Sequence, residues 1–195
     1  DGYYPRLAGK PAGYLYNQLL NFRDGRRHYG LMTHMVDVLS DAYLFEIASH
    51  FASLQVPYPP PAPPTQRAAP EVLQRGRTLA LQGDAARRLP ACADCHGRAL
   101  MGVQTHFPAL LGLPADYLTA QLGGWKTGQR RAASPDCMAR IAERLSDADA
   151  HAVVSWLASQ PVPAQTQAAD ARPASRPLAA DLRCGSAPVP TGPSR

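Results

Sequence analysis

The sequence predicts an all-α fold built from two small helical bundles, and two observations carry that prediction. Apolar residues recur at helical spacing in several segments, and no segment shows the alternating pattern of a half-buried strand. A second region of the chain also repeats the first in order, spacing and chemistry. We therefore expect two copies of one helical fold, joined by a Pro-rich linker and followed by a Pro-rich tail.

The repeat is visible as matching landmarks. Residues 4–11 match residues 107–114, with an aromatic residue, Pro, Leu and Gly in the same places. Tyr14 and Tyr117 follow with the same offset, and a Leu-Ser-Asp triplet ends with Asp147 in the second copy as it does with Asp41 in the first. Duplication explains this order better than chance, and it argues for two domains of one fold.

Each expected helix has a start or a stop signal. Apolar spacing predicts one helix over residues 14–25 and its copy over residues 117–128, each ending at Gly. Ser40 and Ser146 are typical N-caps for the last helix of each copy. A further helix is expected between residues 66 and 90.

Composition sets the domain boundaries. Seven of the 20 prolines fall in residues 57–70 and seven more in residues 161–195, which hold no aromatic residue. Such stretches cannot bury enough apolar surface to offset the entropy of ordering them. We expect domains at residues 1–56 and 70–160, with a linker at 57–69 and a tail at 161–195.

Charge and hydropathy argue against a nucleic-acid partner and against a membrane-spanning segment. The net charge of +5 is spread along the chain, whereas nucleic-acid binding requires a clustered basic surface. No apolar run reaches the ~18 residues of a membrane-spanning helix, so no transmembrane segment is expected in this chain.

The motif that carries chemistry is the C-x-x-C-H run formed by Cys92, Cys95 and His96, the signature of c-type haem attachment. Two thiols one helical turn apart can form thioethers with both vinyl groups of a haem. The next residue, His96, then projects toward the iron as a ligand. A covalent haem would also supply the large apolar core that so small a unit lacks.

Two other interpretations of the cysteines are weaker. A thioredoxin-like redox pair requires a βαβ context, which is missing. A zinc site that adds Cys137 and Cys184 leaves the repeat unexplained. Haem is favoured because a second ligand can be found independently: Met138 stands seven residues before Leu-Ser-Asp, as Met32 does in the first copy.

With these residues in place, the sequence resembles the class I cytochromes c, and specifically the two-domain dihaem cytochrome c4 family. That family shows C-x-x-C-H, then a [YF]-P-x-L-x-G segment, a helix ending near Gly, and Met seven residues before Leu-Ser-Asp. The resemblance covers about residues 1–56 and 70–160. It implies tandem class I cytochrome c domains, each a small helical bundle wrapped around haem.

The resemblance also implies the residues of the haem sites. His96 and Met138 are expected as axial iron ligands in the second domain, and Met32 as the distal ligand in the first. The Pro108 carbonyl, with Pro5 as its counterpart, is expected to accept the Nδ1–H of the ligand histidine. The other expected cofactor contacts are Tyr117, Leu122, Trp125 and Arg130, with Tyr14 and Arg27 in the first copy. For Arg130, pairing with a haem propionate and a solvated surface position both remain open.

The first copy lacks its attachment motif. Residues 1–56 contain no Cys, and the repeat places the equivalent C-x-x-C-H before Asp1. We expect that an upstream motif has been removed, because Met32 and Pro5 look like parts of a haem shell; a first domain without haem is the alternative. One haem c is expected at Cys92 and Cys95, and a second only if the upstream motif exists.

The remaining cysteines, Cys137 and Cys184, allow two interpretations. They could form a disulfide that ties the tail to the second domain, which an oxidising compartment favours. They could also be unrelated thiols.

The resemblance implies an electron-transfer protein rather than an enzyme. A His/Met-ligated iron leaves no open position for a substrate, and Met raises the reduction potential. We expect a bacterial periplasmic protein that carries single electrons from a dehydrogenase or quinol-oxidising complex toward a terminal oxidase. The alternatives are a dedicated cytochrome subunit of a periplasmic dehydrogenase and a haem enzyme with an open iron site.

Overall fold

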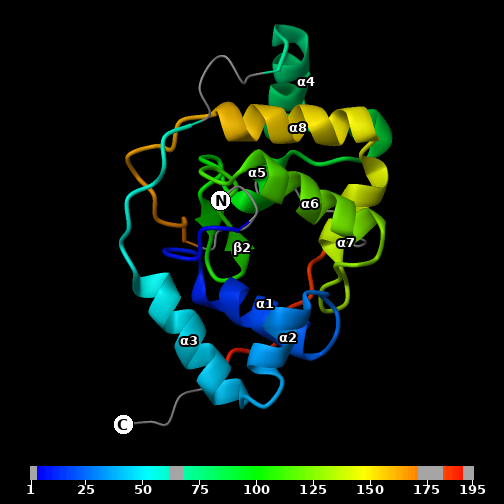
Figure 1. Cartoon of the computed structure of the whole chain (residues 1–195). Helices are drawn as coiled ribbons and strands as arrows, with labels where there is room; N and C mark the ends of the chain where they lie inside the picture. The colour runs from blue at the N-terminus through cyan, green and yellow to red at the C-terminus, as the bar shows by residue number, and fades with distance from the viewer. Residues whose placement is uncertain (1–3, 62–67, 171–181, 191–195) are drawn as a thin grey trace.

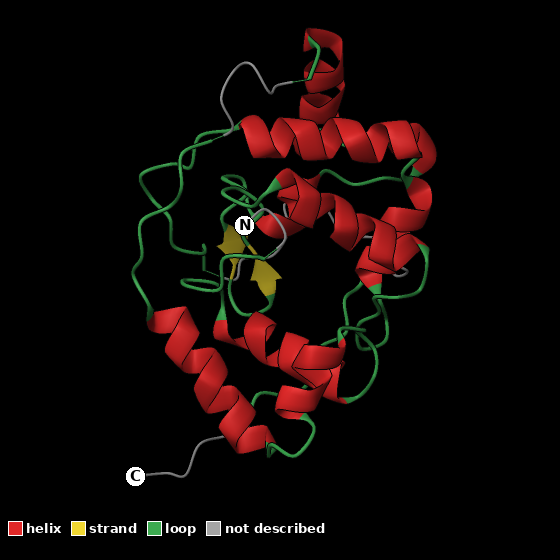
Figure 2. Ribbon diagram, viewed as in Figure 1, coloured by secondary structure: helices red, strands yellow, loops and turns green. Residues whose placement is uncertain are grey.

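The computed structural model describes residues 4–61, 68–170 and 182–190, and these are mostly helical (Figure 1). In chain order the elements are α1 (Ala12–Arg23), α2 (Gly30–Val36), α3 (Asp41–Ser53), α4 (Pro70–Leu81), the 3-10 helix η2 (Ala85–Arg87), α5 (Cys92–His96), β1 (Gly102–Val103), β2 (Phe107–Pro108), α6 (Ala115–Lys126), α7 (Cys137–Arg144) and α8 (Asp147–Ser159). The all-α class is confirmed; β1 and β2 add one short antiparallel hairpin (Figure 2). Among the described helices, none is long and apolar enough to cross a lipid bilayer.

The first copy forms its own hydrophobic cluster from α1, α2 and α3. Ser40 caps α3, because its hydroxyl accepts the backbone N–H of Tyr43 at 3.3 Å, as the sequence predicts. Leu44 of α3 is fully buried in the cluster. Tyr16 of α1 meets Phe45 of α3 edge to face at 5.7 Å between ring centres. Packing of α1 against both other helices therefore holds the first copy together.

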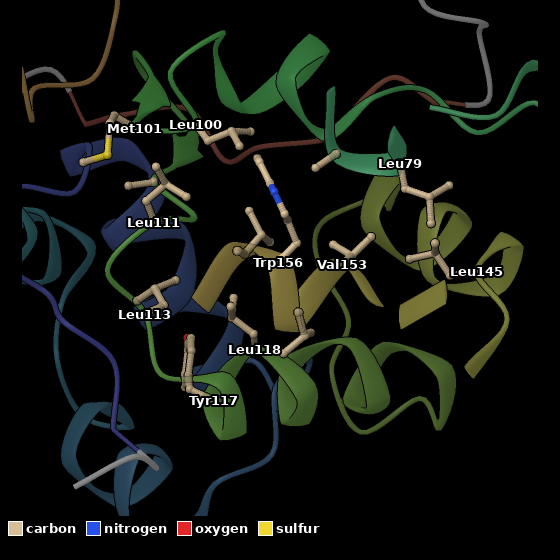
Figure 3. Packing of buried hydrophobic residues seen from close by; sticks show 14 of the residues in the cluster. Leu79, Leu100, Met101, Leu111, Leu113, Tyr117, Leu118, Leu145, Val153 and Trp156 are labelled. Carbon is tan, nitrogen blue, oxygen red and sulfur yellow. The ribbon is translucent and has the colours of Figure 1, made fainter. Parts of the chain in front are cut away.

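The second copy has a larger core, in which α4 crosses α8 (Figure 1). The crossing depends on Gly76: a Cβ there would lie 2.8 Å from the Trp156 Cβ and closer still to the Ala152 carbonyl. Figure 3 shows Leu79 of α4, Leu118 of α6 and Trp156 of α8 among the side chains of this core. Helix α6 packs against both α7 and α8.

The start of α8 carries a network of ion pairs. Ser146 caps the helix by accepting the Asp149 N–H at 3.1 Å, which confirms the predicted N-cap. The Asp149 carboxylate pairs with Arg75 at 2.8 Å and with Arg87 at 2.6 Å. Asp84 pairs with the same two arginines at 3.3 and 3.0 Å. The network joins α4, η2 and the first turn of α8.

Equivalent residues of the two copies meet at the boundary between them. Arg27 donates to Gln121 at 2.8 Å, and Arg130 donates to Gln18 at 3.1 Å. Each guanidinium also reaches a tyrosine of the other copy, at 3.3 and 3.4 Å. These tyrosines are Tyr117 and Tyr14. The contact therefore has approximate two-fold symmetry.

The backbone repeats this symmetry. The N–H of His28 donates to the carbonyl of Gln129 at 3.1 Å, and the N–H of Arg131 donates to the carbonyl of Arg26 at 2.6 Å. These two bonds are equivalent under the sequence repeat, and they seat one edge of the first copy against the second.

Candidate functional site

Helix α5 presents the C-x-x-C-H motif. Neither Cys92 nor Cys95 is in a disulfide, and burial raises the pKa of the Cys92 thiol to about 12 and that of the Cys95 thiol to about 11. Cys137 and Cys184 are bonded to each other, and the described residues offer no cluster of three or more His, Cys, Asp or Glu side chains for a metal ion. The zinc alternative thus lacks its ligands.

The two ring nitrogens of His96 have different roles: Nδ1 makes a hydrogen bond, and Nε2 is the atom that can bind a metal ion. The Nδ1–H donates to the Pro108 carbonyl at 2.8 Å, which leaves Nε2 without a proton. Burial lowers the pKa of His96 and outweighs the opposing effect of that hydrogen bond, so the imidazole is neutral. The β1–β2 hairpin holds Pro108 within hydrogen-bond distance of His96. The hairpin requires glycine at position 102, because a Cβ there would lie 2.6 Å from the Phe107 carbonyl oxygen.

A largely apolar cavity lies beside His96. Its walls come from α1, α5, β2, α6, α7 and α8, with further residues from the segment after β2 and from residues 182–185. The residues predicted as cofactor contacts that line it are Cys92, Cys95, His96, Pro108, Tyr14, Tyr117, Leu122, Trp125, Arg130 and Met138. The structure therefore brings every second-copy residue predicted from the sequence to one cavity, together with Tyr14 from the first copy.

Two polar side chains that line this cavity, Arg130 and Trp125, have no anionic partner among the described residues. Arg130 is buried, and among the described residues its hydrogen bonds go to tyrosine and glutamine side chains rather than to a carboxylate. The Trp125 ring lies 3.9 Å from the Arg130 guanidinium carbon, and the buried Nε1–H of Trp125 has no acceptor among the described residues. Buried donors of this kind require partners, and the propionate carboxylates of a haem would supply them. The residues present therefore fit haem c.

Lys10 is a cavity residue that the sequence argument missed. It reaches the cavity from the first copy, is only 5% exposed, and donates from Nζ to the Ala109 carbonyl at 3.3 Å. Burial lowers the pKa of Lys10. The available signal was a departure from the repeat, because the second copy has Leu113 at the equivalent position.

Three residues predicted for the first copy are not among the residues that line the cavity. Met32 is half-buried and packs against the first hydrophobic cluster. Pro5 is half-buried near the start of the described chain. Arg27 lies at the boundary between the copies, with its guanidinium 4.6 Å from the centre of the Phe22 ring. Their assignment to a first haem site stays a prediction.

The end of the chain also reaches this cavity. Cys137 and Cys184 form a disulfide, which decides between the two interpretations of these cysteines. Leu182, Cys184 and Gly185 line the cavity next to Met138. The possible disulfide between Cys137 and Cys184 was the sequence signal for this contact, although the Pro-rich composition of the tail argued for disorder. Residues 171–181 and 191–195 of the predicted tail, and residues 62–67 of the predicted linker, lie outside the described residues.

Comparison with known sequences places this site among cytochromes. The family model described as Cytochrome c matches residues 73–161. The chain is 43% identical over 170 residues to the thiosulfate dehydrogenase electron acceptor of Thiomonas intermedia, covering 87% of this chain and 76% of that protein. It is 33% identical over 156 residues to cytochrome c4 of Pseudomonas aeruginosa, covering 79% of this chain and 74% of that protein.

Solved structures are similar over most of this chain. Reduced recombinant cytochrome c4 from Pseudomonas stutzeri matches with a TM-score of 0.67 and 29% identity, covering 82% of this chain and 86% of that one. The thiosulfate dehydrogenase TsdBA from Marichromatium purpuratum matches with a TM-score of 0.70 and 32% identity. That match covers 83% of this chain but only 34% of the other, so this chain corresponds to about a third of that protein.

Proposed function

The chain belongs to the c4-like dihaem family of class I cytochromes c and carries haem c bound through Cys92 and Cys95, and from that premise we propose that it accepts single electrons from a periplasmic dehydrogenase. Two relatives, 43% and 39% identical, are named as electron acceptors of thiosulfate dehydrogenase. We infer that the donor is an enzyme of that class, and that the electrons pass on toward a terminal acceptor. This favours a dedicated partner of one dehydrogenase over a general carrier.

One observation carries the proposal: His96, whose Nδ1–H donates to the Pro108 carbonyl, and Met138 line the same apolar cavity. We infer that these two side chains are the axial ligands of the haem iron. Haem bound there supplies a reversible one-electron couple. With both axial positions filled by protein, the site stores an electron and offers no place for a substrate.

The surrounding residues orient and shield the haem. The Pro108 carbonyl fixes the tautomer of His96 and increases its basicity as a ligand. Tyr117 and Leu122 of α6 line the cavity and exclude water from it. Arg130 and Trp125 are inferred to hold the propionates, because their buried N–H groups lack an anionic acceptor.

We also propose a two-domain organisation, with cytochrome domains at residues 1–56 and 70–160. Separate hydrophobic clusters in the two copies support this division. In the first domain, Met32 is the inferred distal ligand and Pro5 the carbonyl acceptor of a second haem site. A bacterial periplasm is inferred from covalent haem attachment and from the disulfide between the cysteines of the second domain and tail.

The proposal is tested with haem-loaded protein from a host that matures c-type cytochromes. Mixing the ferric protein with a thiosulfate dehydrogenase and thiosulfate should reduce it, with a rate proportional to the dehydrogenase concentration. The Met138→His variant is the matched control: it keeps two axial ligands but lowers the reduction potential, and so should be reduced less completely. Reduction no faster than with thiosulfate alone would overturn the donor assignment. Ready binding of carbon monoxide by the ferrous wild type at neutral pH would overturn the closed axial site.

A further inference from the structure

Residues 182–187, here called the C-terminal strap, are anchored to the loop that precedes α7. Leu182 is buried at 6% exposure, and Cys184 is bonded to Cys137, the first residue of α7. The Gly185 N–H donates to the Pro135 carbonyl at 2.8 Å. A disulfide and a backbone hydrogen bond thus fix the strap to residues 135–137.

That stretch presents Met138. The covalent anchor is the residue immediately before it, and the strap lines the cavity beside it. Asp136 ties the same loop from inside, because its carboxylate accepts the N–H of Ala132 at 2.7 Å and that of Ala139 at 3.0 Å. Movement of the backbone that carries Met138 therefore requires the loop, its internal bonds and the strap to move together.

Gly185 shows how closely the strap lies on the loop. A Cβ on this residue would lie 2.6 Å from the Ala133 carbonyl oxygen and closer still to the carbonyl of Ser134. Both neighbours are backbone atoms, which cannot rotate away as a side chain could. The strap therefore needs a residue without a side chain at this point.

The strap also joins the Met138 loop to the first copy. The Ala187 N–H donates to the side-chain carbonyl of Asn17 in α1 at 2.9 Å, and Ala187 packs against the first hydrophobic cluster. In Figure 1 the red segment runs from beside α7 to α1. The loop is thus held between the second copy, to which it belongs, and a fixed point on the first.

We propose that the C-terminal strap is a positioning element that keeps Met138 on the iron and so controls how readily the sixth coordination position opens. This rests on the proposed axial ligation by Met138. The disulfide and Gly185 act together. The disulfide ties the strap to α7, and Gly185 allows the strap to pack closely against the loop before α7.

The test uses ferric holoprotein and imidazole as the competing ligand, with loss of the methionine–iron charge-transfer band as the signal. In the Cys137→Ser/Cys184→Ser and Gly185→Ala variants, imidazole should displace Met138 at least tenfold faster than in the wild type. Arg183→Ala changes an exposed residue of the same strap and should leave the rate unchanged. Far-UV circular dichroism and haem content confirm that each variant is folded and loaded.

A second measurement removes the disulfide without mutation, in case the double variant does not mature. In mature wild-type holoprotein the disulfide is reduced, both thiols are alkylated and the iron is reoxidised, and the same acceleration is expected. If imidazole displaces Met138 at the wild-type rate in both the Gly185→Ala variant and the alkylated protein, the proposed role of the strap is refuted. A wild-type protein without the methionine–iron band would instead overturn the axial assignment on which this proposal rests.

Discussion

Asp149 offers a prediction whose size can be worked from the structure. Its side chain is 10% exposed and pairs with Arg75 at 2.8 Å and Arg87 at 2.6 Å, while Ser146 donates to it at 3.0 Å. Hydrogen bonds from Arg75, opposed by burial and reinforced by Arg87 and Ser146, hold the pKa of Asp149 at about 2, against the usual 3.8. We predict that Asp149→Asn destabilises the fold in a pH-dependent way.

The magnitude follows from the pKa. One pKa unit corresponds to about 1.36 kcal/mol, so the ionised carboxylate stabilises the folded protein by about 2 kcal/mol at neutral pH. The pKa is depressed on folding, so this stability is present above about pH 4 and is lost as the pH falls toward about 2. Arg75 and Arg87 are 42% and 35% exposed, so water can solvate them once Asp149 is neutral and no large further penalty is expected.

Urea unfolding of the holoprotein, followed by far-UV circular dichroism at a series of pH values, measures this effect. The difference in unfolding free energy between wild type and Asp149→Asn should be about 2 kcal/mol at neutral pH and should shrink toward zero below about pH 3. Asp147→Asn, two residues away on an exposed side chain paired with Lys126, is the matched control and should change stability far less. A wild-type-to-Asp149→Asn difference that is constant across this pH range would refute the reasoning.

Three further predictions follow from the cavity and the helix crossing. Met138→Ala should let the ferrous protein bind carbon monoxide, visible as a shifted Soret band, because the inferred sixth ligand is gone; failure to bind would argue against that ligand. Lys10→Met removes a buried cation next to the Ala109 carbonyl and should lower the reduction potential by on the order of tens of millivolts in a spectroelectrochemical titration, with an unchanged or higher potential as the contrary result. Gly76→Val should lower the unfolding free energy by about 2–3 kcal/mol, because the new side chain overpacks the α4–α8 crossing. Gly123→Ala in α6 is the control: a Cβ at Gly123 would meet no described atom within 4 Å, so this change should raise the unfolding free energy by up to about 1 kcal/mol. Equal effects at the two glycines would contradict the packing argument.

Much of the second copy could be predicted because its signals are local. The C-x-x-C-H spacing sets the haem attachment on one helical turn, and Ser146 marks the start of α8 by its own capping chemistry. The cofactor contacts on α6 follow from helical spacing, so Tyr117 and Trp125 reach the same cavity.

The features that escaped prediction depend on contacts between distant segments. Lys10 reaches the cavity only because the two copies pack together, and a buried lysine runs against its usual place at the surface. The disulfide of Cys184 was foreseen as one of two interpretations, but the hydrogen bonds that Gly185 and Ala187 make to Pro135 and Asn17 could not be predicted in a stretch whose composition indicates disorder. The β1–β2 hairpin is too short for any alternation to show in the sequence.

The boundary between the copies has a consequence for the origin of the chain. Arg27 reaches Gln121 while Arg130 reaches Gln18, so each half offers the other the same patch of surface. Such isologous contacts characterise two-fold dimers. A single-unit ancestor with this Gln and Arg would already have been self-complementary, so gene fusion could inherit a ready-made subunit interface instead of having to evolve one.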